Sequence, residues 1–119
     1  MLKNNGAISN LYGKKGEDMA VKYLKKQKYK ILERNFSCKF GEIDIIAKDK
    51  DTIVFVEVKL KNSADFGLPR EKITLSKLKK IKTTAQLYLS MNNFVGVPAR
   101  FDAIEILFEK IEHIKNILS

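Results

Sequence analysis

The fold is decided by residues 41–60, which read GEIDIIAKDKDTIVFVEVKL. Two segments rich in Ile and Val, 42–47 and 52–60, stand on either side of the polar residues 49–51. β-Branched residues favour strands, and a short polar break between two such segments is typical of a hairpin. The sequence therefore predicts two antiparallel strands, from Glu42 to Ala47 and from Thr52 to Leu60.

This predicted hairpin gathers its charged side chains on one face. Side chains alternate between the two faces of a strand, so Glu42 shares a face with Asp44, and Glu57 shares a face with Lys59. The opposite face is purely aliphatic and is the predicted core; it comprises Ile43, Ile45, Val54, Val56 and Val58.

A two-residue loop at 50–51 would place Asp44 opposite Glu57 and Glu42 opposite Lys59. Directly opposed side chains have Cβ atoms about 4.5–5.5 Å apart, a range in which two carboxylates can bind one cation. Without a cation or a shared proton they repel each other. The pairing therefore favours a metal site, provided that no β-bulge shifts the register.

Oxygen donors of this kind favour a hard ion, Mg²⁺ or Mn²⁺, over Zn²⁺. Such an ion polarises a phosphodiester and helps to deprotonate an attacking water. Lys59 could orient that water or neutralise the charge that develops on the phosphate. The non-functional alternative is that these charged side chains line a solvated sheet face, where Lys59 balances the negative charge.

The residues before the hairpin predict a helix from about Asn10 to Gln27, because Ala20, Val21 and Leu24 recur with helical spacing. Glu17 falls on the same inward stripe and could supply a further ligand. A strand from Tyr29 to Phe36 follows, and then a polar break, 37–41.

The residues after the hairpin begin with a predicted loop, Lys61 to Arg70. Thr74 is expected to cap a helix that runs to about Ser90. A further strand is predicted from Arg100 to Leu107, and the tail from Glu109 onward favours a strand over a short helix. The predicted buried stripe of the second helix is Leu78, Ile81, Ala85 and Tyr88.

This order of helix, three strands, helix, strand and tail element predicts an α/β fold. A mixed central sheet flanked by helices is the simplest way to bury the apolar faces. The length of 119 residues suits a single domain over residues 1–119, with residues 1–9 expected to be flexible.

The formal net charge is +9, from 23 basic and 14 acidic residues, and 20 of the basic residues are Lys. Such an excess attracts polyanions, and Lys suits phosphate contact better than the reading of base edges. Nucleic acid is the predicted partner, with DNA favoured over RNA, although Lys also serves solubility. The candidate phosphate contacts are Lys61, Lys77 and Lys80.

The lone Cys38 cannot form an internal disulfide, and residues 1–6 lack the apolar region of a signal peptide. No apolar run approaches the roughly 20 residues of a membrane span. A cytoplasmic protein without a membrane partner is therefore expected.

Five motifs together resemble the YraN family of small bacterial proteins. They are GxxGE at 13–17, GEIDIIA at 41–47, VFVEVK at 54–59, FG at 66–67 and RFD at 100–102. The resemblance extends from about Gly13 to Ile114. It implies a restriction-endonuclease-like fold with a PD-(D/E)xK site, similar to that of archaeal Holliday-junction resolvases.

The resemblance also implies roles for particular residues. It assigns metal ligation to Glu17, Asp44 and Glu57, a further ligand to the backbone carbonyl of Val58, and the catalytic lysine to Lys59. The family usually has Arg after its EVK, whereas this chain has Leu60, so the phosphate contact expected there is in doubt. A homodimer is expected from the resemblance alone.

Three functional hypotheses follow from the sequence. The first is a metal-dependent endodeoxyribonuclease, with branched or distorted DNA as a candidate substrate. The second is a non-catalytic nucleic-acid-binding module, and the third a protein whose basic face docks an acidic partner. Asp102 is interpreted as an ordinary strand charge or ion pair, and His113 as a surface or packing residue, so both are left outside the site.

Overall fold

The computed structural model describes residues 5–61 and 74–118, with side chains from Lys14 onward. The elements are α1 (Asn5–Lys26), β1 (Lys30–Cys38), β2 (Gly41–Asp49), β3 (Thr52–Lys61), α2 (Leu75–Met91), β4 (Ala99–Leu107) and β5 (Lys110–Ile114). The predicted order of elements is confirmed, including the strand in the tail. The loop predicted from Lys61 to Arg70 lies outside the described residues, except that Lys61 ends β3.

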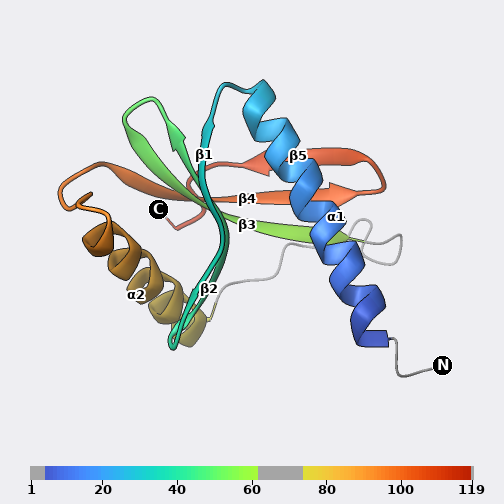
Figure 1. Cartoon of the computed structure of the whole chain (residues 1–119), viewed down its shortest axis with the longest axis horizontal. Coiled ribbons are helices and arrows are strands. Elements are labelled where there is room, and N and C mark those ends of the chain that lie inside the picture. The colour runs from blue at the N-terminus through green and yellow to red at the C-terminus, as the bar shows by residue number, and fades with distance from the viewer. Residues whose placement is uncertain (1–4, 62–73, 119) are drawn as a thin grey trace.

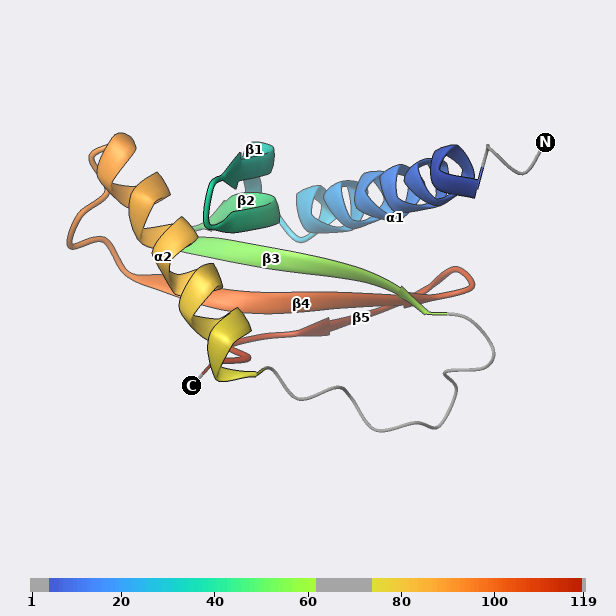
Figure 2. The same ribbon diagram turned by 90° about the horizontal axis from the view of Figure 1, so that it is seen from below.

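The five strands form one sheet in the order β1-β2-β3-β4-β5. Strands β3 and β4 are parallel and the other neighbours are antiparallel, so the sheet is mixed. The two helices lie apart along the long axis of the molecule, as Figures 1 and 2 show from two directions. In the part of the chain that is described, neither helix is long and apolar enough to cross a membrane.

Both faces of the sheet are buried, whereas the sequence predicted a core on one face. One cluster joins α1, through Ala20 and Leu24, to side chains that include Ile45, Val54 and Val56. The other joins α2, through Ala85 and Tyr88, to Ile46, Ile53 and Phe55. This second face is covered at Phe55, which is only 1% exposed, and is partly open to solvent at Glu57, whose side chain is 42% exposed.

The register of the central hairpin is as predicted over its first five pairs, from Asp49 with Thr52 to Ile45 with Val56. The regular pairing ends there, one pair short of Asp44 with Glu57. Instead, the backbone N–H of Val58 donates to Oδ2 of Asp44 over 2.8 Å. The side chain of Asp44 therefore accepts this hydrogen bond in place of a backbone carbonyl of β2. The predicted pair of Asp44 with Glu57 is not part of the regular ladder, although Glu57 lies near enough to raise the pKa of Asp44.

The end of this pairing also changes which face Ile43 occupies. Strict alternation placed Ile43 beside Ile45, but Ile43 packs in the α2 cluster and Ile45 in the α1 cluster. The two residues flank Asp44, so the alternation breaks where β2 leaves its regular pairing with β3. Ile43 is therefore a correction to the predicted core.

Two predicted boundaries are wrong. α1 begins at Asn5 rather than Asn10, so residues 5–9 belong to the helix. Nothing at Asn10 stops a helix, since the preceding residues include Ala7 and Ile8 and no proline. β1 continues to Cys38, which leaves only residues 39–40 for the turn into β2.

The cap of α2 is as predicted, because the Thr74 hydroxyl accepts from the N–H of Lys77 over 3.1 Å. Along its predicted stripe Ala85 and Tyr88 are buried, while Leu78 and Ile81 are half-buried. This cap fixes where the helix starts, and so where Lys77 and Ile81 stand relative to the sheet.

Candidate functional site

Asp44 stands at the centre of the candidate site. Its half-buried carboxylate accepts the hydrogen bond from Val58 described above. Burial raises its pKa, the bond from Val58 opposes this, and the carboxylates of Glu17, Glu57 and Glu42 raise it further, to about 6. The fold therefore concentrates negative charge around one buried acid, which is an arrangement typical of functional sites.

Two of these neighbouring acids are held by cations of the chain itself. Nζ of Lys77 lies 3.2 Å from Oε1 of Glu57, and both side chains are about half exposed, at 52% and 42%. The guanidinium of Arg34 lies 3.7 Å from Oε1 of Glu17 and 2.6 Å from Oδ1 of Asp18. An exposed ion pair such as that of Lys77 with Glu57 stabilises a protein by only about 0–1 kcal/mol, so a stronger cation can displace Lys77.

Gly16 allows α1 to bring Glu17 to this site. A Cβ atom at position 16 would lie 2.8 Å from Cγ of Leu60, which is closer than carbon atoms normally approach. Only a residue without a side chain fits between α1 and the end of β3 without a shift. The close approach of α1 and β3 thus explains the second glycine of the GxxGE motif, Gly16.

The donor set fits a hard divalent ion in its chemistry, because Asp44, Glu17 and Glu57 offer oxygen atoms only. Within residues 5–61 and 74–118, however, no group of three or more His, Cys, Asp or Glu side chains converges as metal ligands do. Two of the three carboxylates, those of Glu17 and Glu57, lie against Arg34 and Lys77 instead. Metal ligation, including by the carbonyl of Val58, and the catalytic role of Lys59 stay predictions.

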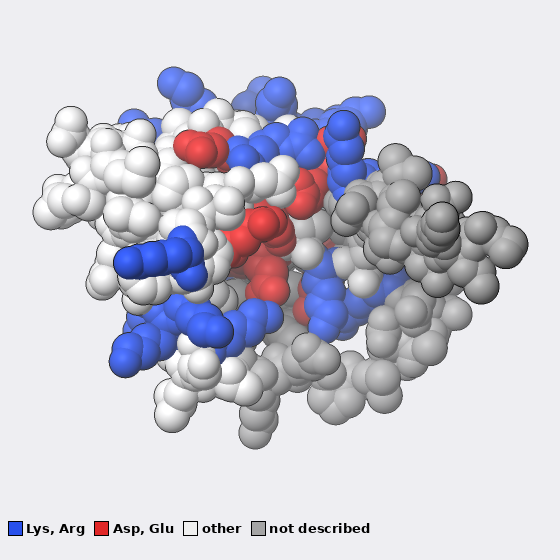
Figure 3. Space-filling view, turned by 60° about the horizontal axis from the view of Figure 1, so that its bottom comes forward, with Lys and Arg blue, Asp and Glu red and all other residues white. Residues whose placement is uncertain are grey.

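A hollow of about 110 Å³ lies next to these acids, between the sheet, α2 and the C-terminal residues. Its lining includes Glu42, Asp44 and Glu57 from β2 and β3, and Lys77 from α2. Figure 3 shows acidic side chains gathered in a hollow, with Lys and Arg side chains on two sides of them. Sequence reasoning missed the hollow, because its walls come from segments that show no relation in the sequence.

The three predicted phosphate contacts differ in their surroundings. Nζ of Lys61 lies 2.9 Å from Oε1 of Glu105, and the two side chains are only 19% and 8% exposed. Lys77 is paired with Glu57, and Lys80 is exposed on α2. Lys80 is therefore the best placed of the three to meet a phosphate, and Lys61 the worst.

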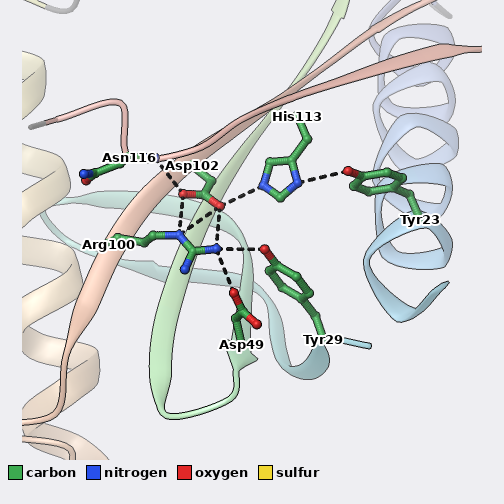
Figure 4. Close-up of polar contacts among 7 residues, drawn as sticks. All are labelled: Tyr23, Tyr29, Asp49, Arg100, Asp102, His113 and Asn116. Atoms are coloured by element: carbon green, nitrogen blue, oxygen red, sulfur yellow. Dashed lines mark hydrogen bonds and ion pairs between the residues drawn. The ribbon is translucent and has the colours of Figure 1, made fainter. Parts of the chain in front are cut away.

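A second polar cluster surrounds Asp102, which is fully buried (Figure 4). Its carboxylate accepts from Nε of Arg100 over 3.0 Å and from the N–H of Asn116 over 3.0 Å, and lies 2.7 Å from Nε2 of His113. Burial alone would raise the pKa of Asp102, but the hydrogen bonds from His113 and Arg100 outweigh it and lower the pKa.

This cluster joins β2, β4 and β5 to α1 and to Tyr29, which lies between α1 and β1. Arg100 also donates to the hydroxyl of Tyr29 over 2.8 Å and to Asp49 over 3.2 Å, and Nδ1 of His113 lies 3.1 Å from the hydroxyl of Tyr23. The ion pair expected for Asp102 exists, although it is far larger than the sequence suggested. The side chain of His113 is 5% exposed, in agreement with a packing role.

The chain is an α/β protein in which a helix, three strands, a second helix and two strands follow one another and the strands form one mixed sheet. With a partly buried acid at its centre, this arrangement is compatible with the restriction-endonuclease-like fold. A family model described as "Uncharacterised protein family UPF0102" matches residues 16–106. The chain belongs to this family, which is the YraN family, so the resemblance is confirmed.

Curated relatives of similar length carry the same family name. A UPF0102 protein of Persephonella marina is 54% identical over 109 residues, which cover 92% of this chain and 94% of that protein. One from Caldanaerobacter subterraneus is 49% identical, with 87% and 91% covered. One from Clostridioides difficile is 48% identical, with 85% and 90% covered.

Proposed function

We propose that this protein is a metal-dependent endodeoxyribonuclease that hydrolyses phosphodiester bonds, with branched DNA among its candidate substrates. The observation that supports this most is the surroundings of Asp44. A half-buried acid has its pKa raised to about 6, in part by three further carboxylates. Such a concentration of negative charge is costly without a cation, and a bound Mg²⁺ or Mn²⁺ would compensate it.

In this proposal Asp44 and Glu57 hold the ion, with Glu17 and the carbonyl of Val58 as further ligands. The ion, when bound, supplies Lewis-acid stabilisation of the phosphoryl oxygens and lowers the pKa of water. The N–H of Val58 fixes the orientation of the Asp44 carboxylate, which leaves its second oxygen for a ligand. The ammonium of Lys59 donates to the phosphate and neutralises charge as the bond to the leaving oxygen breaks.

The charge of the protein supports DNA as the substrate. The net charge of +9 attracts a polyanion, and Lys and Arg side chains flank the acidic hollow (Figure 3). Lys80, which is exposed on α2, contacts a phosphate in this proposal. Lys77 reaches a phosphate once Glu57 turns to the metal, because the Lys77 ammonium is then released.

One observation favours the alternative, a nucleic-acid-binding module without catalysis. Glu17 and Glu57 already have cationic partners, Arg34 and Lys77, and ion pairs of this kind could replace a metal permanently. On this alternative, DNA binding is sensitive to salt and indifferent to the loss of the Asp44 carboxylate.

Cleavage of labelled single-stranded, duplex, flap and four-way-junction DNA with Mn²⁺ or Mg²⁺ decides between the two. The variants are Asp44→Asn and Lys59→Ala, and Asp51→Asn in the exposed β2–β3 turn is the matched control. Cleavage by wild type and control that both site variants abolish supports the enzyme. Intact DNA in every lane, with binding retained, would favour the non-catalytic module.

Two further features belong to the same proposal. A cytoplasmic location fits the lone Cys38, since reducing compartments do not favour disulfides. A symmetric dimer suits an enzyme that cuts two equivalent strands, and it is expected from the resemblance to resolvases only.

A further inference from the structure

The hollow beside Asp44 has two kinds of wall. Its apolar part includes Phe55 and Phe101, paired neighbours on β3 and β4 whose rings stack with centroids 5.1 Å apart, and Ile81 from α2. Its polar part consists of carboxylates and the ammonium of Lys77. An apolar pocket with a few convergent polar groups and an acid of raised pKa is the usual form of a small-ligand site.

The size of the hollow limits what it can hold. Its volume is about 110 Å³. An engineered apolar cavity of about 150 Å³ holds one benzene ring, so this hollow, which is open on one side, has room for no more than one six-membered ring and excludes two fused rings. A flat ring is also the shape that aromatic and aliphatic side chains such as Phe101 and Ile81 contact well.

The polar side selects among such rings by their hydrogen-bonding groups. With Asp44 and Glu57 engaged by the ion, Glu42 is the remaining carboxylate, and it can only accept. Cytosine offers it the N4 amino group, a pairing that carboxylates make with this base. Its carbonyl accepts one of the three N–H groups of Lys77, which leaves the others for the phosphate. Thymine would present its O4 acceptor to the carboxylate, together with a bulky methyl group.

We propose that this hollow binds one unpaired pyrimidine base, cytosine in preference to thymine, next to the phosphodiester at the Asp44 site. The inference rests on the proposed function, since it is the bound phosphodiester that brings a base to the hollow. A base inside a duplex must first be unstacked and unpaired, at a free-energy cost that an unpaired base does not carry. The substrate is therefore DNA with an unpaired nucleotide, as in a single strand, a flap or the centre of a junction.

Binding without cleavage tests this separately from catalysis. Labelled thymine oligonucleotides carry one central cytosine, thymine or abasic site, and their Kd values are measured by fluorescence anisotropy in Ca²⁺, with intact DNA verified on a gel. For the wild type we expect the Kd of the strand with a central cytosine to be about fivefold lower than that of the strand with a central thymine. The abasic strand should bind about five- to tenfold more weakly than the cytosine strand.

Two variants alter the hollow, and each has a matched control. Glu42→Gln gives an amide that can accept or donate, so the preference for cytosine should disappear while affinity is largely kept; Glu109→Gln, in the exposed β4–β5 turn, should keep the preference. Ile81→Trp fills the hollow and should abolish the difference between cytosine and abasic strands. Leu87→Trp, at a position 37% exposed on the same helix, should keep it.

Equal affinities of the wild type for the cytosine, thymine and abasic strands would overturn the inference, as would Glu42→Gln behaving like its control. If Ile81→Trp fails to fold, the Glu42 pair alone decides. Base discrimination without cleavage under any metal would leave the pocket standing and count against the enzyme. Cleavage without base discrimination would support the enzyme and overturn the proposed base pocket.

Discussion

Replacing Asp44 by Asn should stabilise the metal-free protein at neutral and alkaline pH. The wild-type carboxylate has its pKa raised from 3.8 to about 6 by burial and by Glu17, Glu57 and Glu42. The folded state thus binds the proton more tightly than the unfolded state. Its extra stability is fully present below pH 3.8 and is lost as the pH rises through about 6.

The magnitude follows from the two pKa values. A difference of one in pKa corresponds to about 1.4 kcal/mol, so the full effect is at most about 3 kcal/mol. Asp44 is half-buried, and solvent screening reduces this to about 1–2 kcal/mol. Asn carries no charge and can still accept the N–H of Val58, so Asp44→Asn should gain this amount at pH 8 and only a small part of it near pH 4.

Thermal unfolding in EDTA, from pH 4 to pH 8, measures the effect. For a domain of this length about 1 kcal/mol corresponds to roughly 4 °C, so we expect Asp44→Asn to melt about 4–8 °C above the wild type at pH 8. Asp51→Asn, the exposed control, should melt with the wild type. Mn²⁺ at about 100 times its Kd would then stabilise the wild type by about 2.7 kcal/mol and Asp44→Asn by much less.

A variant that melts at or below the wild-type temperature throughout pH 6–8 would show that Asp44 is not under electrostatic strain. Equal stabilisation of both proteins by Mn²⁺ would remove Asp44 from the ligand set. The first result bears on the charge cluster and the second on the metal, so the two parts of the reasoning fail independently.

Three further substitutions test the fold around the site. Asp102→Ala should cost about 3–5 kcal/mol in urea unfolding, because it leaves buried donors without their acceptor; a loss below about 1 kcal/mol would contradict the central place of that carboxylate. In an exposed helix, Gly→Ala stabilises by about 1 kcal/mol. Gly16→Ala should instead lower the melting temperature, and it should become stabilising only when Leu60→Ala has removed the contact. An effect of the same sign in both backgrounds would argue against the close approach of α1 and β3. Lys61→Met should cost about 1–3 kcal/mol by leaving Glu105 buried without this partner, and the slope of log Kd for DNA against log salt should stay unchanged; a shallower slope would mean that Lys61 contacts phosphate after all.

Most of the fold could be predicted because the strands carry strong local signals. The Ile- and Val-rich segments on either side of 50–51 fixed both the hairpin and its register as far as Ile45 and Val56. The cap at Thr74 is a local hydrogen bond, and a Thr before a helical apolar pattern announces it. These features depend on residues close together in the chain.

The end of the hairpin could not be predicted, because alternation assumes that regular pairing continues. Whether the Asp44 side chain replaces a backbone acceptor for the N–H of Val58 depends on how far β2 and β3 separate, and sequence spacing carries no information on that separation. The same departure moved Ile43 to the other face of the sheet. The pairing of Glu57 with Lys77 was likewise hidden, since 20 residues separate the two.

The Asp102 cluster was underestimated for a related reason. A lone His and an Asp in a strand carry no local pattern, and the other members of the cluster lie on α1, on β2 and just before β1. One signal was present: an Arg two residues before the Asp lies on the same face of a strand and so predicts an ion pair. That the Asp would be fully buried required knowing that β5 covers it, which only the tertiary arrangement decides.

The Asp102 cluster has a consequence for the order in which the chain folds. Its contacts between Tyr23 and His113 and between Tyr29 and Arg100 span 90 and 71 residues, whereas β1, β2 and β3 pair through short turns. Contacts that close long loops form late, so we expect this cluster to assemble after the folding transition state. Weakening it should then accelerate unfolding and leave the folding rate almost unchanged. The cluster would thus govern the lifetime of the native state rather than the speed of reaching it.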